Sequence, residues 1–145
     1  MKRALIAILT VIIMAISINP IRARAASEDD LLAYINSART QAGLGTLSLD
    51  EELTGVALTR ASESSVNFSH VRPNGTAWYT VSSLTNGENL AHARNDNQKK
   101  PENVMLAFLL SPTHKANVMR SSFTVVGIAY YVGDNGDTYI ACEFR

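Results

Sequence analysis

The sequence predicts an α+β domain in which helices pack on a mostly antiparallel sheet. Apolar residues recur at helical spacing in three stretches, at about residues 28–42, 51–66 and 101–119. Residues 125–144 instead hold two runs of β-forming residues around an Asn-Gly turn. The chain has 145 residues, of which 46% are hydrophobic and 18% charged, which suits one domain with one core. Helices first and strands last are typical of an α+β domain.

The first 25 residues resemble a cleavable export signal. Lys2 and Arg3 precede an apolar run from Ala4 to Ile18, and Ala23 and Ala25 supply the small residues that signal peptidase recognises. We therefore predict a signal peptide over residues 1–25, a mature domain over residues 26–145, and secretion. The alternative is an uncleaved membrane anchor, although a 15-residue helix spans about 22 Å, less than the roughly 30 Å of a bilayer core.

Charge and cysteine content narrow the class of protein. Cleavage would leave 9 basic and 13 acidic residues, a net charge of −4. No basic run survives, so nucleic acid is not an expected partner.

The chain has one cysteine, Cys142, and therefore no internal disulfide. Its neighbours Tyr139, Ile140 and Phe144 predict that it is a buried strand residue.

Two helices are predicted in the first half of the chain. The first runs from about Glu28 to Ala42, because Ser27 is a suitable N-cap and Gly43 a suitable C-cap. The second follows the N-cap Asp50 and runs to about residue 66, with acidic residues in its first turn. Its predicted buried side contains Leu53, Val56, Ala57, Arg60, Ala61 and Ser64.

A third helix and a short fourth helix are predicted between residues 101 and 119. Pro101 suits the first helical position, and Ser111-Pro112 ends or bends the helix. A short helical turn follows from Thr113 to Met119. The buried face of the third helix should contain Val104, Met105, Phe108 and Leu109.

A β-hairpin is predicted at the C-terminus, from Val125–Val132 and Thr138–Phe144. The residues Asp134-Asn135-Gly136-Asp137 between them favour a tight turn. This acidic turn lacks the longer alternating series of ligands that a calcium loop needs. Leu90 and Ala91 indicate one further strand.

A long polar loop, Asn67–Gly87, separates the second helix from that strand, and a loop of this length often carries function. His70 lies in it, His92 lies in what reads as a second polar loop, and His114 lies in the short fourth helix. We expect His92 to be solvated surface.

Short motifs follow one another along the chain in the order found in one known family. They are an opening segment from Tyr34 to Asp50, S-H-V-R-P-N-G at residues 69–75, G-E-N-L-A at residues 87–91 and S-P-T-H-K-A-N at residues 111–117. Together they cover about residues 31–144. The chain thereby resembles bacterial members of the CAP superfamily (cysteine-rich secretory protein, antigen 5, pathogenesis-related 1), of the SCP-like extracellular type.

The resemblance implies a CAP-type α-β-α sandwich with a cleft where two histidines and acidic partners converge. His70 and Glu88 match the family's first histidine and its G-E-N glutamate, and His114 matches the histidine of the bacterial motif. Eukaryotic members place their second histidine in a G-H-Y-T-Q strand that this chain lacks. They also carry a glutamate where this chain has Ser111. The expected cleft residues are His70, Glu88, His114 and Ser111.

Several functions are compatible with this cleft. Neutral imidazoles bind zinc well, so His70, His114 and Glu88 are candidate ligands for zinc or another divalent metal. The same residues could instead form a hydrogen-bonded cluster that braces the long loop. Glu63 could line the cleft or be a surface carboxylate.

We therefore expect a secreted, non-enzymatic binding module for a divalent metal or for a lipid-like or cell-surface ligand. One alternative is a metal-dependent hydrolase with Glu88 as its base. Another is an envelope protein held in the membrane by an uncleaved N-terminal segment. No residue is assigned a catalytic role.

Overall fold

A computed structural model describes residues 20–145, with side chains described from residue 26 onward. Most of the predicted signal peptide, residues 1–19, lies outside the described residues. No helix in the described part of the chain is both long and apolar enough to cross a bilayer. The elements are α1 (Pro20–Gln41), β1 (Ser48–Leu49), α2 (Glu51–Val66), the 3₁₀ helix η1 (Trp78–Val81), β2 (Gly87–Ala93), α3 (Pro101–Leu110), α4 (Pro112–Val118), β3 (Val125–Val132) and β4 (Thr138–Phe144).

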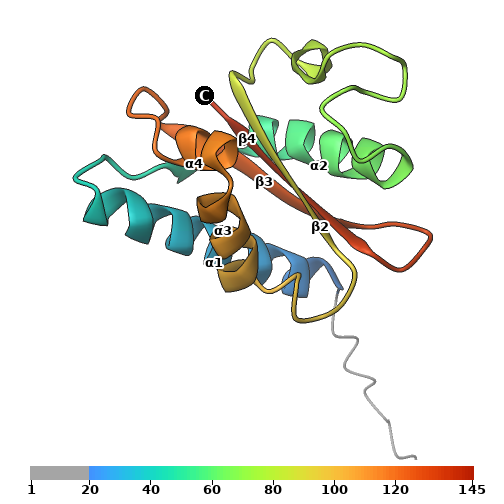
Figure 1. Ribbon diagram of the computed structural model, residues 1–145, viewed down its shortest axis with the longest axis horizontal. Coiled ribbons are helices and arrows are strands. Elements are labelled where there is room, and N and C mark those ends of the chain that lie inside the picture. The colour runs from blue at the N-terminus through green and yellow to red at the C-terminus, as the bar shows by residue number, and fades with distance from the viewer. Residues whose placement is uncertain (1–19) are drawn as a thin grey trace, which may run out of the picture.

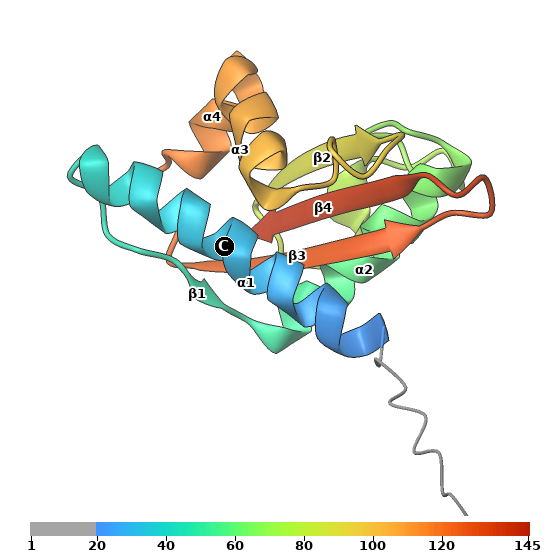
Figure 2. The ribbon, with the colours of Figure 1, turned by 90° about the horizontal axis from the view of Figure 1, so that it is seen from below.

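The strands form one sheet in the order β1-β3-β4-β2. Strands β3, β4 and β2 pair antiparallel, and the two-residue strand β1 pairs parallel with the start of β3. Helix α2 packs on one face of the sheet, and α1, α3 and α4 contribute to the core on the other (Figures 1 and 2). The predicted α+β class and α-β-α sandwich are therefore confirmed.

The capping residues Asp50 and Pro101 and the glycines of two turns act as the sequence predicts. The carboxylate of Asp50 accepts a hydrogen bond from the Leu53 amide at 2.9 Å, which satisfies a free N–H group at the start of α2. Pro101 is the first residue of α3. Gly43 after α1 and Gly136 in the hairpin turn both adopt a positive φ, of 73° and 81°, which glycine tolerates best.

Two local predictions were wrong. Helix α1 begins at Pro20 rather than near Glu28, because the alanine- and arginine-rich residues before Ser27 favour helix and continue it past the expected cap. His92 is not in a loop, because β2 stays paired with β4 as far as Ala93. The half-buried His92 ring stacks on Tyr139 at 4.5 Å between centroids, and its Nε2 lies 2.7 Å from a carboxylate oxygen of Asp137.

The two faces of the sheet are filled differently. Toward α1 and α3 the core holds large side chains, and both Phe108 and Cys142 are fully buried, as predicted. Toward α2 it holds small ones, including Ala129 and Ala141. At Gly127 the helix backbone comes so close that an added Cβ would lie 2.0 Å from the carbonyl carbon of Leu53. Residues without bulk therefore let α2 lie directly on the sheet.

Arg39, near the end of α1, is a buried cation that binds main-chain oxygens. Its guanidinium donates to the carbonyl of Gly45 at 2.7 Å and to three carbonyls at the end of α4 and just beyond it. Those three belong to Val118, Arg120 and Phe123, at 2.8, 3.0 and 3.1 Å. The side chain thus ties the first helix to a segment about 80 residues further along the chain.

Candidate functional site

The structure brings together three of the four predicted cleft residues from three separate elements. His70 follows α2, Glu88 lies on β2 and His114 lies on α4. Nδ1 of His70 is 2.6 Å from Oε1 of Glu88. The two imidazole rings lie edge to face, with their centroids 6.3 Å apart. Residues 44 positions apart therefore meet beside one buried carboxylate.

Glu88 is almost fully buried, and both of its oxygens have partners. Arg60 donates through Nε to Oε2 at 2.6 Å and through a terminal nitrogen to Oε1 at 3.3 Å, and His70 lies against Oε1. Burial alone would raise the pKa of Glu88, but the hydrogen bonds with His70 and Arg60 outweigh it and the pKa lies below its ordinary value. Glu88 is therefore an anion held by these two side chains.

Arg60 also organises the residues before His70. It donates to the carbonyl of Ser69 at 2.9 Å and to the carboxylate of Glu63 at 2.5 Å. Arg72 binds the same carboxylate, and this contact more than any other holds the pKa of Glu63 below its usual range. Glu63 therefore belongs to an ion-pair network that fastens the long loop to α2.

His70 has a defined hydrogen-bonding role within this cluster. A carboxylate only accepts hydrogen bonds, so the proton between the two groups belongs on Nδ1 of His70. In the neutral ring the lone pair is then on Nε2, and the side chain is 51% exposed. A histidine oriented by a carboxylate in this way is a common arrangement around protein-bound metals.

His114 is positioned by amide side chains that join α4 to β2. Asn89 donates to the main-chain oxygen of His114 at 3.0 Å, and Asn117 donates to that of Glu88 at 3.1 Å. The ring of Phe108 lies 5.4 Å from the His114 ring, edge to face. Burial, and then the nearby His70, lower the pKa of His114 despite the opposing charge of Glu88. His114 is therefore a neutral imidazole at pH 7.

Ser111, the fourth predicted cleft residue, lies at the junction of α3 and α4. Its hydroxyl is 3.3 Å from that of Thr113. None of the contacts described for the chain links it to either imidazole. Its position therefore fits a helix junction better than a ligand contact.

Two residues beside the site were not singled out from the sequence for this role. Arg60 was expected on the buried face of its helix and was given no role at the site. Glu143 appeared only as a member of the last strand, yet it is fully buried directly opposite Glu88. The available signal was the same in both cases, namely a charged residue in an otherwise apolar pattern, which requires a buried partner.

The fit of a divalent metal depends on the two imidazoles. Among the described residues, no group of three or more His, Cys, Asp or Glu side chains is arranged to hold a metal ion. Glu88 fits the expected ligand set poorly because Arg60 and His70 already occupy its oxygens. His70 and His114 fit as a two-imidazole pair with further coordination positions open.

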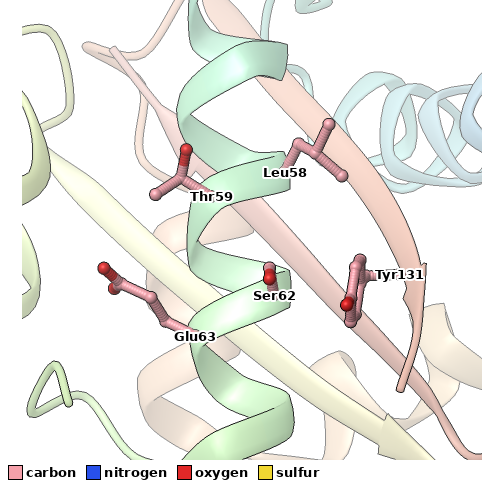
Figure 3. A pocket seen from close by; sticks show the side chains of 5 residues that line it. All are labelled: Leu58, Thr59, Ser62, Glu63 and Tyr131. Carbon is pink, nitrogen blue, oxygen red and sulfur yellow. The ribbon is translucent and has the colours of Figure 1, made fainter. Parts of the chain in front are cut away.

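A separate hollow of about 420 Å³ lies along α2 and β3. Figure 3 shows that Glu63 points to the opposite side of the helix from Tyr131. The residues that line the hollow are Leu58, Thr59, Ser62, Glu63 and Tyr131. None of the three histidines lines it, and its one carboxylate is already bound by two arginines.

Comparisons with known proteins agree with this architecture. Residues 32–144 match the model of the CAP family, described as the cysteine-rich secretory protein family. The uncharacterized protein YkwD of Bacillus subtilis (strain 168) is 30% identical over 113 residues, covering 72% of this chain and 42% of that protein. The chain thus spans less than half the length of this curated relative.

Solved structures with the same fold include surface and extracellular proteins. An outer surface protein of Borrelia burgdorferi has a TM-score of 0.65 and 22% identity, covering 81% of this chain and 92% of that one. An extracellular SCP-domain protein of Bacillus anthracis str. Ames has a TM-score of 0.68 and 18% identity. The match covers 84% of this chain and 41% of that one. NaASP2, in a structure with Zn²⁺, has a TM-score of 0.62 and 16% identity. The match covers 81% of this chain and 78% of that one.

The order of motifs, the three-layer fold and the family match over residues 32–144 agree with one another. The chain belongs to the CAP family, the cysteine-rich secretory protein family.

Proposed function

We propose that this chain is an exported, non-enzymatic binding module that takes up a divalent transition metal through His70 and His114. The observation that carries the proposal is the contact of His70 Nδ1 with Glu88 at 2.6 Å, which leaves Nε2 of a half-exposed imidazole free. His114 supplies the second imidazole, with its ring centroid 6.3 Å away. When bound, the metal would supply open coordination positions for an oxygen or nitrogen donor of a cell-surface or lipid-like ligand.

Export is part of this proposal. The first 25 residues carry the features of a signal peptide. Two of the structural relatives are described as an outer surface protein and an extracellular protein. The NaASP2 structure with Zn²⁺ supports a metal in a domain of the same fold.

The position of Glu88 favours binding over hydrolysis. A general base must reach a water molecule or the substrate, and its pKa should lie near the working pH. Glu88 is 3% exposed, is bound by Arg60 and His70, and has a pKa below its ordinary value. It suits the task of orienting His70, so we expect no chelator-sensitive turnover of ester, amide or phosphate substrates.

Zinc calorimetry at pH 7.5 tests the metal proposal. His70→Ala and His114→Ala should each weaken binding at least 100-fold, because each removes a ligand. Glu88→Gln should weaken it about 10- to 100-fold, the usual effect of losing a group that orients a ligand. His92→Ala is the matched control, because His92 is bound to Asp137 on the hairpin, and it should leave the affinity within twofold.

The pH dependence provides a second test. Protons compete with the metal for imidazole, so the affinity should fall as the pH drops below about 6.5. Equal affinities for the wild type and the His70→Ala, His114→Ala double variant would refute the proposal. The cluster would then be a brace for the long loop.

A further inference from the structure

Glu143 is a second buried glutamate behind the candidate site, and neither the motifs nor the proposed function uses it. It lies on β4 directly opposite Glu88 on β2, and its residue is 0% exposed. Its neighbour on the other side, on β3, is Gly127, which has no side chain to pair with it. Glutamates that face each other across an antiparallel pair repel when both are charged.

The cations near this pair do not match two buried anions. All the donor nitrogens of Arg60 are directed at Glu88, Glu63 and the carbonyl of Ser69. Glu143 receives one hydrogen bond, from the hydroxyl of Thr85 to Oε2. Its other oxygen, Oε1, has no donor among the described residues. A second anion here would be buried without a counterion, which is a costly state.

A proton on Glu143 resolves this mismatch. Burial, and then the charge of Glu88, raise the pKa of Glu143 far above that of an ordinary glutamate. Glu143 and Glu88 are direct partners in the β2–β4 pair, and a hydrogen bond between their carboxyl groups requires a proton on one of them. With a proton, the Glu143 carboxyl can donate a hydrogen bond to Glu88, while Oε2 continues to accept from Thr85.

We propose that Glu143 is a positioning residue: as a neutral acid it donates a hydrogen bond to Glu88 and fixes that carboxylate in the orientation that holds Nδ1–H of His70. Through this chain, a residue that does not touch the imidazole determines which His70 nitrogen is free. The inference concerns the metal-free protein, and it rests on the proposed function only where zinc is the readout.

An amide tests this role because it reproduces both hydrogen bonds of the neutral acid. In Glu143→Gln the NH₂ group can donate to Glu88 and the amide oxygen can accept from Thr85. In Glu143→Leu both hydrogen bonds are lost at similar volume. A positioning residue therefore tolerates glutamine and not leucine, whereas a residue that must be an anion, as a ligand or a base, tolerates neither.

The direct readout is the tautomer of His70, measured by ¹⁵N–¹H NMR of the imidazole rings at pH 8 without metal. His70→Ala identifies the signal, and the exposed Glu52→Gln is the matched control for removing a carboxylate. The wild type, Glu52→Gln and Glu143→Gln should hold His70 mainly as the Nδ1–H tautomer. In Glu143→Leu the Nε2–H population should rise several-fold, because the orientation of Glu88 is no longer fixed.

Two results would overturn the inference, namely loss of the Nδ1–H preference in Glu143→Gln, or its full retention in folded Glu143→Leu. If Glu143→Leu does not fold, Thr85→Val decides the matter, because it removes the other hydrogen bond that fixes Glu143. Thr85→Val should raise the Nε2–H population of His70, as expected for Glu143→Leu. An unchanged tautomer ratio in Thr85→Val would equally overturn the inference.

Zinc affinity is the second readout. Glu143→Leu should bind zinc about 10- to 100-fold more weakly than the wild type, and Glu143→Gln should stay within threefold. Failure of the wild type to bind zinc would refute the proposed metal function alone, since the tautomer measurement needs no metal. A changed tautomer with unchanged zinc affinity would show that Glu143 positions His70 without serving metal binding.

Discussion

Replacing Gly127 by alanine tests how closely α2 lies on the sheet. The added Cβ would lie 2.0 Å from the carbonyl carbon of Leu53 and 2.2 Å from its oxygen, whereas ordinary contacts are 3.4–4 Å. The atoms it meets are backbone, so no side-chain rotation relieves the overlap and α2 must retreat by roughly 1.4 Å. Overpacking a core costs about 1–3 kcal/mol when side chains can adjust, so we expect a loss of about 3 kcal/mol or more.

Chemical denaturation followed by circular dichroism measures this loss as a shift of the midpoint at constant m-value. Gly55→Ala is the matched control, because Gly55 is an exposed residue of the same helix with nothing within 4 Å of the added Cβ. It should raise the free energy of unfolding by about 0.5–1 kcal/mol, since alanine favours helix over glycine. A loss below about 1 kcal/mol for Gly127→Ala would show that α2 does not approach β3 as described.

Three other predictions concern the core, the buried acid and export. Phe108→Ala should lower the free energy of unfolding by about 3–5 kcal/mol, and a loss under about 1 kcal/mol would mean that this face of α3 is not buried. The pKa of Glu143 rises on folding from 4.5 to about 9, so its stabilising contribution is full at acid pH and is lost as the pH rises across that interval. Glu143→Gln should therefore gain stability relative to the wild type between pH 5 and pH 9 in a denaturation series, and parallel profiles would contradict this. Intact-mass analysis of secreted protein should give an N-terminus at Ala26, whereas full-length chain found only in membranes would contradict cleavage.

Local signals predicted most of the fold. Helices α2 and α3 and the C-terminal hairpin begin and end close to where Asp50, Pro101 and the Asn135-Gly136 turn indicate. These residues act on backbone groups within a few positions, so their effect is visible in the sequence. The start of α1 was missed because Ser27 is a suitable N-cap, yet the residues before it favour helix even more.

Long-range partners were harder to predict. The family motifs indicated that His70, Glu88 and His114 would converge, but not that Arg60 would occupy the carboxylate between them. Glu88 and Glu143 are 55 residues apart in the sequence, and they meet because of the register in which β2 pairs with β4. No local sequence pattern specifies that register. His92 was misplaced for the same reason, because its strand is defined by its partner strand rather than by its own polar neighbours.

The main-chain carbonyls bound by Arg39 show how two distant parts of the chain are held together without a disulfide. The chain has a single cysteine, so no covalent bridge joins α1 to the segment after α4. Arg39 makes that connection through hydrogen bonds to main-chain oxygens, none of which titrates or changes with redox potential. This connection needs no oxidation step, so it can form equally in a reducing compartment and outside the cell, and thiol reductants should leave it intact.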